Sequence, residues 1–215
     1  MNIRLNRFIQ VAYPVLVYYL LYNILTSVFH MILGDRVSEL TCLLFASIIT
    51  AIVIYFVYRK LPIVKAEIQF SVHDLKRDLI YILIIVATGI ALNLFVTYTP
   101  LNLFLDNYNS STEILYSGDL YIKILANAIF IPILEELIFR GIVCGQLSMW
   151  YGNRCGIIIS AVLFGIMHFN VIQFLYAFLM GLLLAYVYNS TKKLWVTSLA
   201  HGLTNFIVII FTFIS

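Results

Sequence analysis

Two glutamates and an arginine, Glu135, Glu136 and Arg140, interrupt a long apolar stretch of the sequence. On insertion scales, each ionised group at the centre of a membrane span costs about 2.5 to 3.5 kcal/mol, so three such groups need compensation. Glu136 and Arg140 are four residues apart and lie on one helix face, where they can form an ion pair. Glu135 lies about 100° around the helix from Glu136 and is not compensated by that pair. It is the candidate general base, because a desolvated carboxylate is more basic than one in water.

Two histidines in later apolar segments add groups that can transfer protons. His168 follows Phe164 by four residues, at a point where an apolar stretch must turn. Irregular backbone at membrane depth is tolerated where it is buried in protein or lines a water-filled cavity, so a wet pocket is expected near His168. His201 and Asn205 are also four residues apart and project from one helix face. Together with the glutamates, these residues favour a functional site over isolated polar groups of a core.

Other interpretations of these residues remain open. Both glutamates and Arg140 could form a buried ion network that only fixes helix packing, and a single buried histidine is usually a hydrogen-bonded core group. Cys144 lies on the same helix face as Glu136 and could be a thiol nucleophile, although a small residue in close helix packing explains it equally well. The sequence contains no G-x-S-x-G, HExxH, P-loop or dinucleotide-binding motif.

The composition indicates the environment of these residues. Of 215 residues, 63% are hydrophobic and only 11% are charged, whereas an ordinary globular domain carries about 25% charged residues. The chain therefore has too few charges for a water-facing surface, and its partner is the lipid bilayer. The net charge of +3 comes without a basic stripe interleaved with aromatic residues, so nucleic acid is not an expected partner. We predict an all-α, polytopic integral membrane helical bundle with its active site within the membrane.

Apolar segments of about 20 residues, long enough to span a bilayer, divide the chain. The stretch from Cys155 to Asn189 would be about 52 Å long as one helix, too long for a bilayer, so it must turn back. We place the turn at His168-Phe169-Asn170, with Asn170 capping the second helix. The first segment is too long for a signal peptide and is expected to be a retained span. The seven predicted spans are 8–33, 40–58, 79–99, 120–148, 155–168, 171–189 and 194–214.

The positions of lysine and arginine predict the topology, because cytoplasmic loops are enriched in both. With a cytoplasmic N-terminus, the outer loops hold only Arg36 and Lys123, and the segment 100–119 is external with Asp106, Glu113 and Asp119. We treat residues 1–215 as a single multi-pass membrane domain. The basic residues placed inside are Arg4, Arg7, Arg59, Lys60, Lys65, Lys76, Arg77, Arg154, Lys192 and Lys193.

Three motifs in order resemble those of the CPBP (CAAX protease and bacteriocin-processing, Abi) family of intramembrane proteases, which includes the type II CAAX prenyl endopeptidases. The family motifs EExxxR, FxxxH and HxxxN stand here at 135–140, 164–168 and 201–205. The resemblance covers a catalytic core at about 119–215, while 1–118 matches only as spans without motifs. Family members often have eight spans, so the resemblance allows one more than the seven counted here.

The resemblance implies a proteolytic site that opens to the cytoplasmic side. In the family, the glutamate and histidine matching Glu135 and His168 activate water, and the pair matching His201 and Asn205 stabilises the oxyanion. Glu136 and Arg140 would support the electrostatics of the site. Many members are named metalloproteases, and Glu135, His168 and His201 could hold a zinc ion. We expect no cofactor, because the same residues also suffice for metal-free water activation.

These observations favour an endopeptidase that cuts a membrane-associated peptide or protein. The compact chain resembles bacterial members, so a bacterial cell membrane is expected, with peptide pheromone or bacteriocin processing or self-immunity as implied roles; CAAX cleavage is the eukaryotic role. The alternative is a non-proteolytic bacteriocin immunity or membrane scaffold protein with the same fold. A transporter is a third class, but it predicts polar signals in both halves, and here they lie in the second half. The oligomeric state is not predicted.

Overall fold

The computed structural model describes residues 3–61, 74–99 and 119–214. Within these ranges every regular element is a helix, which confirms the predicted all-α membrane bundle. The predictions for Lys65 and for the external residues Asp106 and Glu113 lie outside the described residues. By length and composition, the described helices able to cross a membrane are Asn6–Leu33, Glu39–Lys60, Leu75–Tyr98, Val171–Thr191 and Leu194–Ile214.

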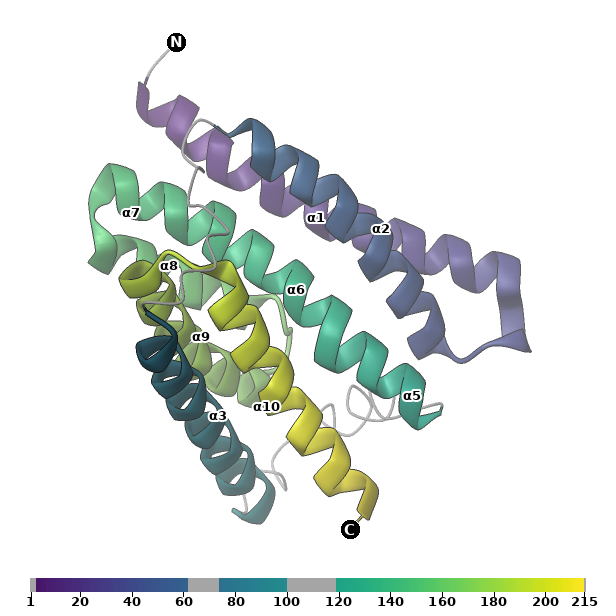
Figure 1. Cartoon of the computed structure of the whole chain (residues 1–215). Helices are drawn as coiled ribbons and strands as arrows, with labels where there is room; N and C mark the ends of the chain where they lie inside the picture. Colours follow the sequence, from purple (N-terminus) through teal and green to yellow (C-terminus); the bar gives the residue numbers. More distant parts are fainter. Residues whose placement is uncertain (1–2, 62–73, 100–118, 215) are drawn as a thin grey trace.

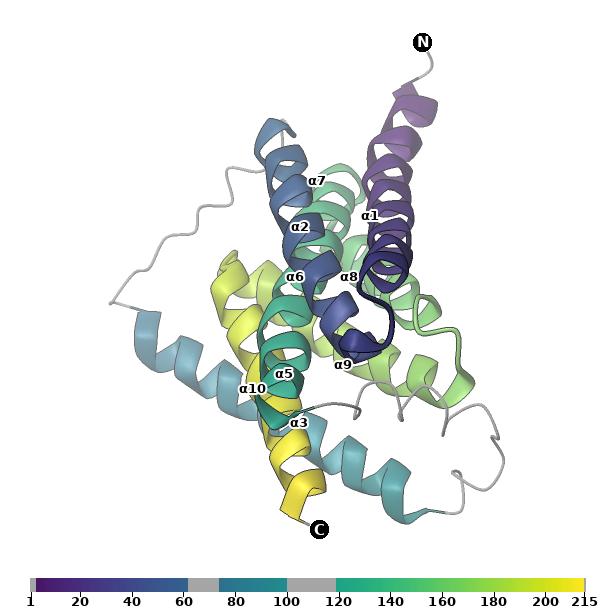
Figure 2. The ribbon, with the colours of Figure 1, turned by 90° about the vertical axis from the view of Figure 1, so that its right-hand side faces the viewer.

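The first two helices form an antiparallel pair at one side of the molecule (Figures 1 and 2). Helix α1 (Ile3–Leu33) is followed by a single 3-10 turn, η1 (Gly34–Arg36), and then by α2 (Glu39–Lys60). Ser38 caps α2, because its hydroxyl oxygen accepts a hydrogen bond of 3.3 Å from the Thr41 amide. The predicted spans at 8–33 and 40–58 are thus confirmed as helices that continue slightly beyond their apolar parts.

The fourth predicted span is a continuous helical run over 120–151 in which α-helical and π-helical segments alternate (Figure 1). The wider π register shifts backbone hydrogen bonds by one residue, and such segments are frequent at functional sites. Both glutamates end the short central α-helix, with a π segment on each side of it. The segments are α5 (Leu120–Lys123), η4 (Ile124–Phe130), α6 (Ile131–Glu136), η5 (Leu137–Cys144) and α7 (Gly145–Tyr151).

The predicted turn at 168–170 is confirmed. It connects α8 (Asn153–Ile166), which has 14 residues, with α9 (Val171–Thr191). The Asn170 side chain caps α9 as expected, since its Oδ1 accepts hydrogen bonds from the amides of Ile172 and Gln173 at 3.0 and 3.1 Å. This cap holds the start of α9 directly beside His168.

The last helix, α10 (Leu194–Ile214), lies between α3 (Leu75–Tyr98) and the α5–α6 run (Figure 1). Gly202 permits this position, because a Cβ atom there would collide with the backbone carbonyl of Ala128. Close contact at Gly202 brings the side chains that follow on α10 toward α6.

Successive long helices run in opposite directions between two ends of the bundle, as Figures 1 and 2 show. The start of α1 contacts the end of α7, where the Arg7 guanidinium lies 5.6 Å from the Trp150 ring centre. The start of α3 contacts the turn before α10, where Lys193 Nζ lies 2.6 Å from Asp78 Oδ2. We call this the basic end; the opposite end contains the η1 turn, the α8–α9 turn and the C-terminus. The described basic residues near the basic end are Arg4, Arg7, Arg59, Lys60, Lys76, Arg77, Arg154, Lys192 and Lys193.

Candidate active site

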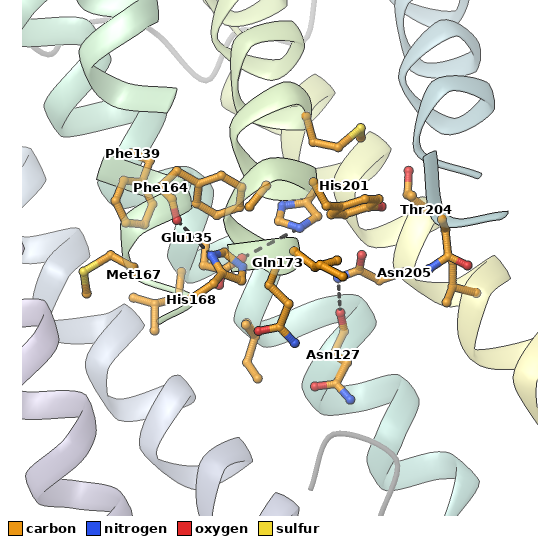
Figure 3. A pocket seen from close by; sticks show the side chains of 18 of the residues that line it. Asn127, Glu135, Phe139, Phe164, Met167, His168, Gln173, His201, Thr204 and Asn205 are labelled. Carbon is orange, nitrogen blue, oxygen red and sulfur yellow. Dashed lines mark hydrogen bonds and ion pairs between the residues drawn. The ribbon is translucent and has the colours of Figure 1, made fainter. Parts of the chain in front are cut away.

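A cavity of about 340 Å³ lies among α1, α3, the α5–η5 run, the α8–α9 turn and α10. All four predicted catalytic residues line it (Figure 3): Glu135, His168, His201 and Asn205. They belong to three motifs that are up to about 70 residues apart in sequence. The fold places these motifs around one cavity. The pocket expected beside His168 is present as this cavity.

The predicted ion pair between Glu136 and Arg140 is present and completely buried. Arg140 Nη1 lies 3.0 Å from Glu136 Oε1, and both side chains have 0% exposure. The guanidinium also lies over the Phe164 ring, 4.5 Å from its centre, where a cation is attracted by the aromatic face. This pair links the first motif to the second, and neither residue lines the cavity. Glu136 and Arg140 therefore lie behind the wall of the cavity, in contact with residues that line it.

His201 lies between the two glutamates. Its Nδ1 is 3.1 Å from Glu136 Oε1, and its Nε2 is 3.7 Å from Glu135 Oε2. A carboxylate only accepts hydrogen bonds, so the bond to Glu136 requires a proton on Nδ1. Sequence reasoning assigned Glu136 to Arg140 alone and missed this contact between residues on different helices. The contact fixes the ring of His201 so that Nε2 faces Glu135.

His168 is oriented by the backbone of its own helix. Its Nδ1 lies 2.9 Å from the carbonyl oxygen of Phe164 (Figure 3). A carbonyl accepts hydrogen bonds, so Nδ1 carries a proton and donates it to this bond. In the neutral ring, Nε2 then has a lone pair that can accept a proton. The four-residue spacing between Phe164 and His168 thus explains how the histidine is held. The carbonyl of Phe164 binds Nδ1, and the centre of its ring lies 5.0 Å from the centre of the imidazole.

Asn205 is held by a backbone carbonyl of the first π segment. Its Nδ2 donates a hydrogen bond of 2.8 Å to the carbonyl oxygen of Asn127 (Figure 3). In the π register the amide of Ile131 donates a hydrogen bond to the carbonyl of Ala126, five residues earlier. The next amide in this register would therefore donate to the carbonyl of Asn127. That position is Pro132, which has no N–H. Pro132, inside an apolar span, was the sequence signal that a backbone carbonyl would be left for a side-chain donor. Sequence reasoning missed this signal.

Sequence reasoning also missed the walls of the cavity that come from outside the motifs. Helix α1 contributes Tyr18 and Tyr22, and α3 contributes Asn93 and Val96. These residues belong to the part of the chain that was predicted to hold only spans without motifs. Cys144, considered as a nucleophile, is buried against Asn189, whose Nδ2 lies 3.0 Å from its sulfur, and does not line the cavity.

Glu135, His168 and His201 have the nitrogen and oxygen donors that zinc accepts. As placed, however, they do not form a ligand set: within 3–61, 74–99 and 119–214, no group of three His, Cys, Asp or Glu residues could hold a metal ion. The positions of these side chains instead follow from their bonds to protein groups.

Known proteins resemble the part of the chain that carries this site. Residues 117–207 match the family described as type II CAAX prenyl endopeptidase Rce1-like. A Bacillus subtilis (strain 168) protein with the name "Putative membrane peptidase YdiL" is 38% identical over 89 residues, which cover 41% of this chain and 36% of that protein. The aligned segment is thus little more than a third of the relative's length. No solved structure matches the chain.

The matched range contains all three motifs and ends just after Asn205. Residues 117–207 are therefore similar to the Rce1-like type II CAAX prenyl endopeptidase family, which confirms the resemblance inferred from the motifs. Helices α1, α2 and α3 lie outside the matched range. The catalytic candidates lie within the matched range, whereas part of the cavity wall is supplied by the rest of the chain.

Proposed function

We propose that the chain is an intramembrane endopeptidase that hydrolyses a peptide bond of a membrane-associated peptide or protein. The observation that supports this most is the convergence of Glu135, His168, His201 and Asn205 on one cavity within a helical membrane bundle. These side chains supply a base and hydrogen-bond donors, which are the groups that hydrolysis of an amide requires. The similarity of residues 117–207 to the Rce1-like family supports the same class of reaction.

In the proposed mechanism, a water molecule in the cavity is bound between the Glu135 carboxylate and Nε2 of His168. Glu135 takes a proton from this water as the oxygen attacks the peptide carbonyl, and a tetrahedral oxyanion forms. The proton then passes to the leaving amine as the C–N bond breaks. His168, whose Nδ1 is fixed by the Phe164 carbonyl at 2.9 Å, orients the water. This general-base step contributes about 10² to 10⁴ in rate.

The oxyanion is stabilised by donors that are held in place before the reaction. Glu136 accepts a hydrogen bond from Nδ1 of His201 at 3.1 Å. In the mechanism the ring also carries a proton on Nε2, so that both nitrogens donate and Nε2 is the donor toward the cavity. Asn205 uses one amide hydrogen for the Asn127 carbonyl and has a second for the substrate. Fixed donors need no reorganisation when charge develops, which makes this contribution large.

The lining of the cavity fits an apolar portion of the substrate next to the scissile bond. Aromatic and aliphatic side chains form much of the wall. Such a surface favours an apolar peptide side chain, which contributes about 1.5 to 3 kcal/mol when buried. The apolar wall residues include Phe139, Phe164, Met167, Ile172, Met180, Val208 and Ile209.

The test is cleavage of peptides by the purified full chain in detergent or nanodiscs, with products identified by mass spectrometry. We expect cleavage by the parent chain and loss of cleavage in Glu135→Ala, His168→Ala and His201→Ala. The matched control is His30→Ala, which changes a histidine near the end of α1. If all three variants fold and keep full biological activity in cells, the function is a non-proteolytic immunity or scaffold role.

Treatment with chelators tests whether the water is activated without a metal ion. Because the water is activated by protein groups, we expect EDTA and 1,10-phenanthroline to leave the cleavage rate within about twofold of its value without chelator. Elemental analysis of the purified chain should find less than one zinc per ten molecules. Loss of activity in chelator with recovery on added zinc would instead assign Glu135, His168 and His201 to a catalytic metal.

A further inference from the structure

The cavity does not lie centrally between the two ends of the bundle. Its lining residues include Val96 in the last turn of α3, His168 in the α8–α9 turn and Gln173 in the first turn of α9. At about 1.5 Å per residue, Val96 lies about 31 Å along α3 from its first residue, Leu75, a distance equal to the thickness of a hydrocarbon core. These residues are at the end opposite the basic end.

The catalytic side chains mark the deep part of the same cavity. Asn205 lies about 17 Å along α10 from Leu194, close to the middle of a bilayer. Glu135 is likewise near the middle of the 120–151 run. The cavity therefore extends from mid-membrane to the end that contains the α8–α9 turn, and its catalytic groups would be reached from that side.

Charge distinguishes the two ends. The described basic residues gather near the basic end, whereas the turns at the opposite end contain Arg36 and Lys123 beside Glu39 and Asp119. Short loops rich in lysine and arginine stay on the cytoplasmic side of a membrane, and acidic residues have little influence. By this rule the basic end is cytoplasmic and the opposite end is external.

Two expectations from the sequence are therefore incompatible in this fold. A cytoplasmic N-terminus places the α8–α9 turn outside, whereas the family resemblance implied a site that opens to the cytoplasm. Both cannot hold, because the start of α1 and the turn that holds His168 lie at opposite ends of the bundle (Figures 1 and 2). The charge distribution belongs to this chain itself, so it decides the orientation.

We propose that the catalytic cavity opens to the external face of the membrane and receives its substrate from that side. The substrate class, which rests on the proposed endopeptidase function, is an exported or outer-leaflet-anchored peptide with an apolar segment beside the scissile bond. The lipidated tail of a cytosolic protein would not reach the mouth of the cavity. Cleavage thus takes place after the substrate has crossed the membrane.

Cysteine labelling in intact cells tests the orientation without requiring activity. Cys42 and Cys144 are buried, so a Cys155→Ser chain is the background. Cysteine is then placed at Val171, which is 65% exposed beside the α8–α9 turn, or at Tyr151, which is 49% exposed at the basic end. Neither residue lines the cavity. We expect a membrane-impermeant maleimide to label V171C in intact cells and Y151C only after permeabilisation.

The reverse labelling pattern would overturn the proposal. A third variant, Gln173→Cys, tests the cavity itself because Gln173 lines it; external reagent should label it in intact cells. Resistance of Q173C before permeabilisation and labelling afterwards would place the mouth on the cytoplasmic side.

Cleavage assays in oriented vesicles separate this proposal from the proposed function. An internally quenched, membrane-impermeant peptide with an apolar core and a lysine tail is added to right-side-out or inverted vesicles. We expect cleavage in right-side-out vesicles. Cleavage in inverted vesicles alone would overturn the external opening. External labelling of V171C and Q173C without cleavage of any peptide by either vesicle type would leave the orientation standing and count against the endopeptidase function.

Discussion

Glu135 and Glu136 are neighbours of the same type that the structure places in different environments. Glu136 has 0% side-chain exposure and binds both Arg140 and His201. Glu135 has 16% exposure, lines the cavity and lies 3.7 Å from His201 Nε2. One carboxylate thus holds the site together, and the other is available to water. Their roles follow from helix geometry, because consecutive residues point about 100° apart.

This division predicts different consequences for the same substitution at the two positions. Glu135→Gln should keep the fold and lower kcat by about 10² to 10⁴, because only the base is lost. Glu136→Gln leaves the Arg140 charge buried without its partner and should reduce the free energy of unfolding by about 3 to 5 kcal/mol. Thermal unfolding and cleavage rates of both variants check this. Equal destabilisation by the two changes would contradict it.

At the scale of elements, the sequence predicted the helices better than their internal hydrogen bonding. The helices and the turn capped by Asn170 followed from composition and length, because lipid requires every backbone group to be satisfied within a helix. Of the seven predicted spans, five correspond to described helices long and apolar enough to cross a membrane. The π segments η4 and η5 did not follow, since their register depends on contacts with neighbouring helices. The His201–Glu136 bond was missed for the same reason: the two residues are 65 positions apart, and helix spacing alone cannot pair residues on separate helices.

Pro132 connects the π register to the catalytic site. In Pro132→Ala, a restored N–H can bond to the Asn127 carbonyl and compete with Asn205, whose amide would lose its fixed orientation. One hydrogen bond is worth about 0.5 to 1.5 kcal/mol net, so we expect kcat to fall by up to about tenfold. Cleavage rates with a KM measurement check this, and KM should change little.

The control for Pro132→Ala is Pro14→Ala, which makes the same change inside α1 and should leave kcat unchanged. Adding Asn205→Ala provides a second control. If Pro132 acts through Asn205, then Pro132→Ala should have no further effect on kcat in the Asn205→Ala background. Fully additive effects would mean that Pro132 influences the site by another route.

For the whole molecule, one buried junction at the basic end should support stability at a distance from the catalytic cavity. At the basic end, Asp78 has 0% side-chain exposure and lies 2.6 Å from Lys193 Nζ. Asp74 is 3.4 Å from the same nitrogen but has 41% exposure. These carboxylates join the start of α3 to the turn between α9 and α10, and neither lines the cavity. The cavity can therefore be changed without loss of this junction.

Asp78→Asn should destabilise the bundle without changing its chemistry. It leaves the buried Lys193 ammonium without its main partner, at a cost of about 3 to 5 kcal/mol. Asp74→Asn removes an exposed partner and should cost less than about 1 kcal/mol. Unfolding followed by circular dichroism would check the order of stability. The cleavage rate per folded molecule should stay within about twofold in both variants, and a large loss in folded Asp78→Asn would show that the two ends are coupled.

The cavity combines the proposed catalytic groups, which lie within the matched range 117–207, with walls from α1 and α3, so selectivity should depend on residues outside that range. Tyr22 is the most direct test, because it lines the cavity from α1 and carries none of the proposed catalytic groups. In Tyr22→Leu the relative kcat/KM for peptides with aromatic and small residues beside the scissile bond should change by about tenfold, the range that pocket contacts supply. Tyr19→Leu makes the same change at a residue of that helix that does not line the cavity and should leave this ratio unaltered. Equal shifts in both variants would mean that α1 affects the bundle generally, and selectivity would then be assigned to the walls formed by α9 and α10.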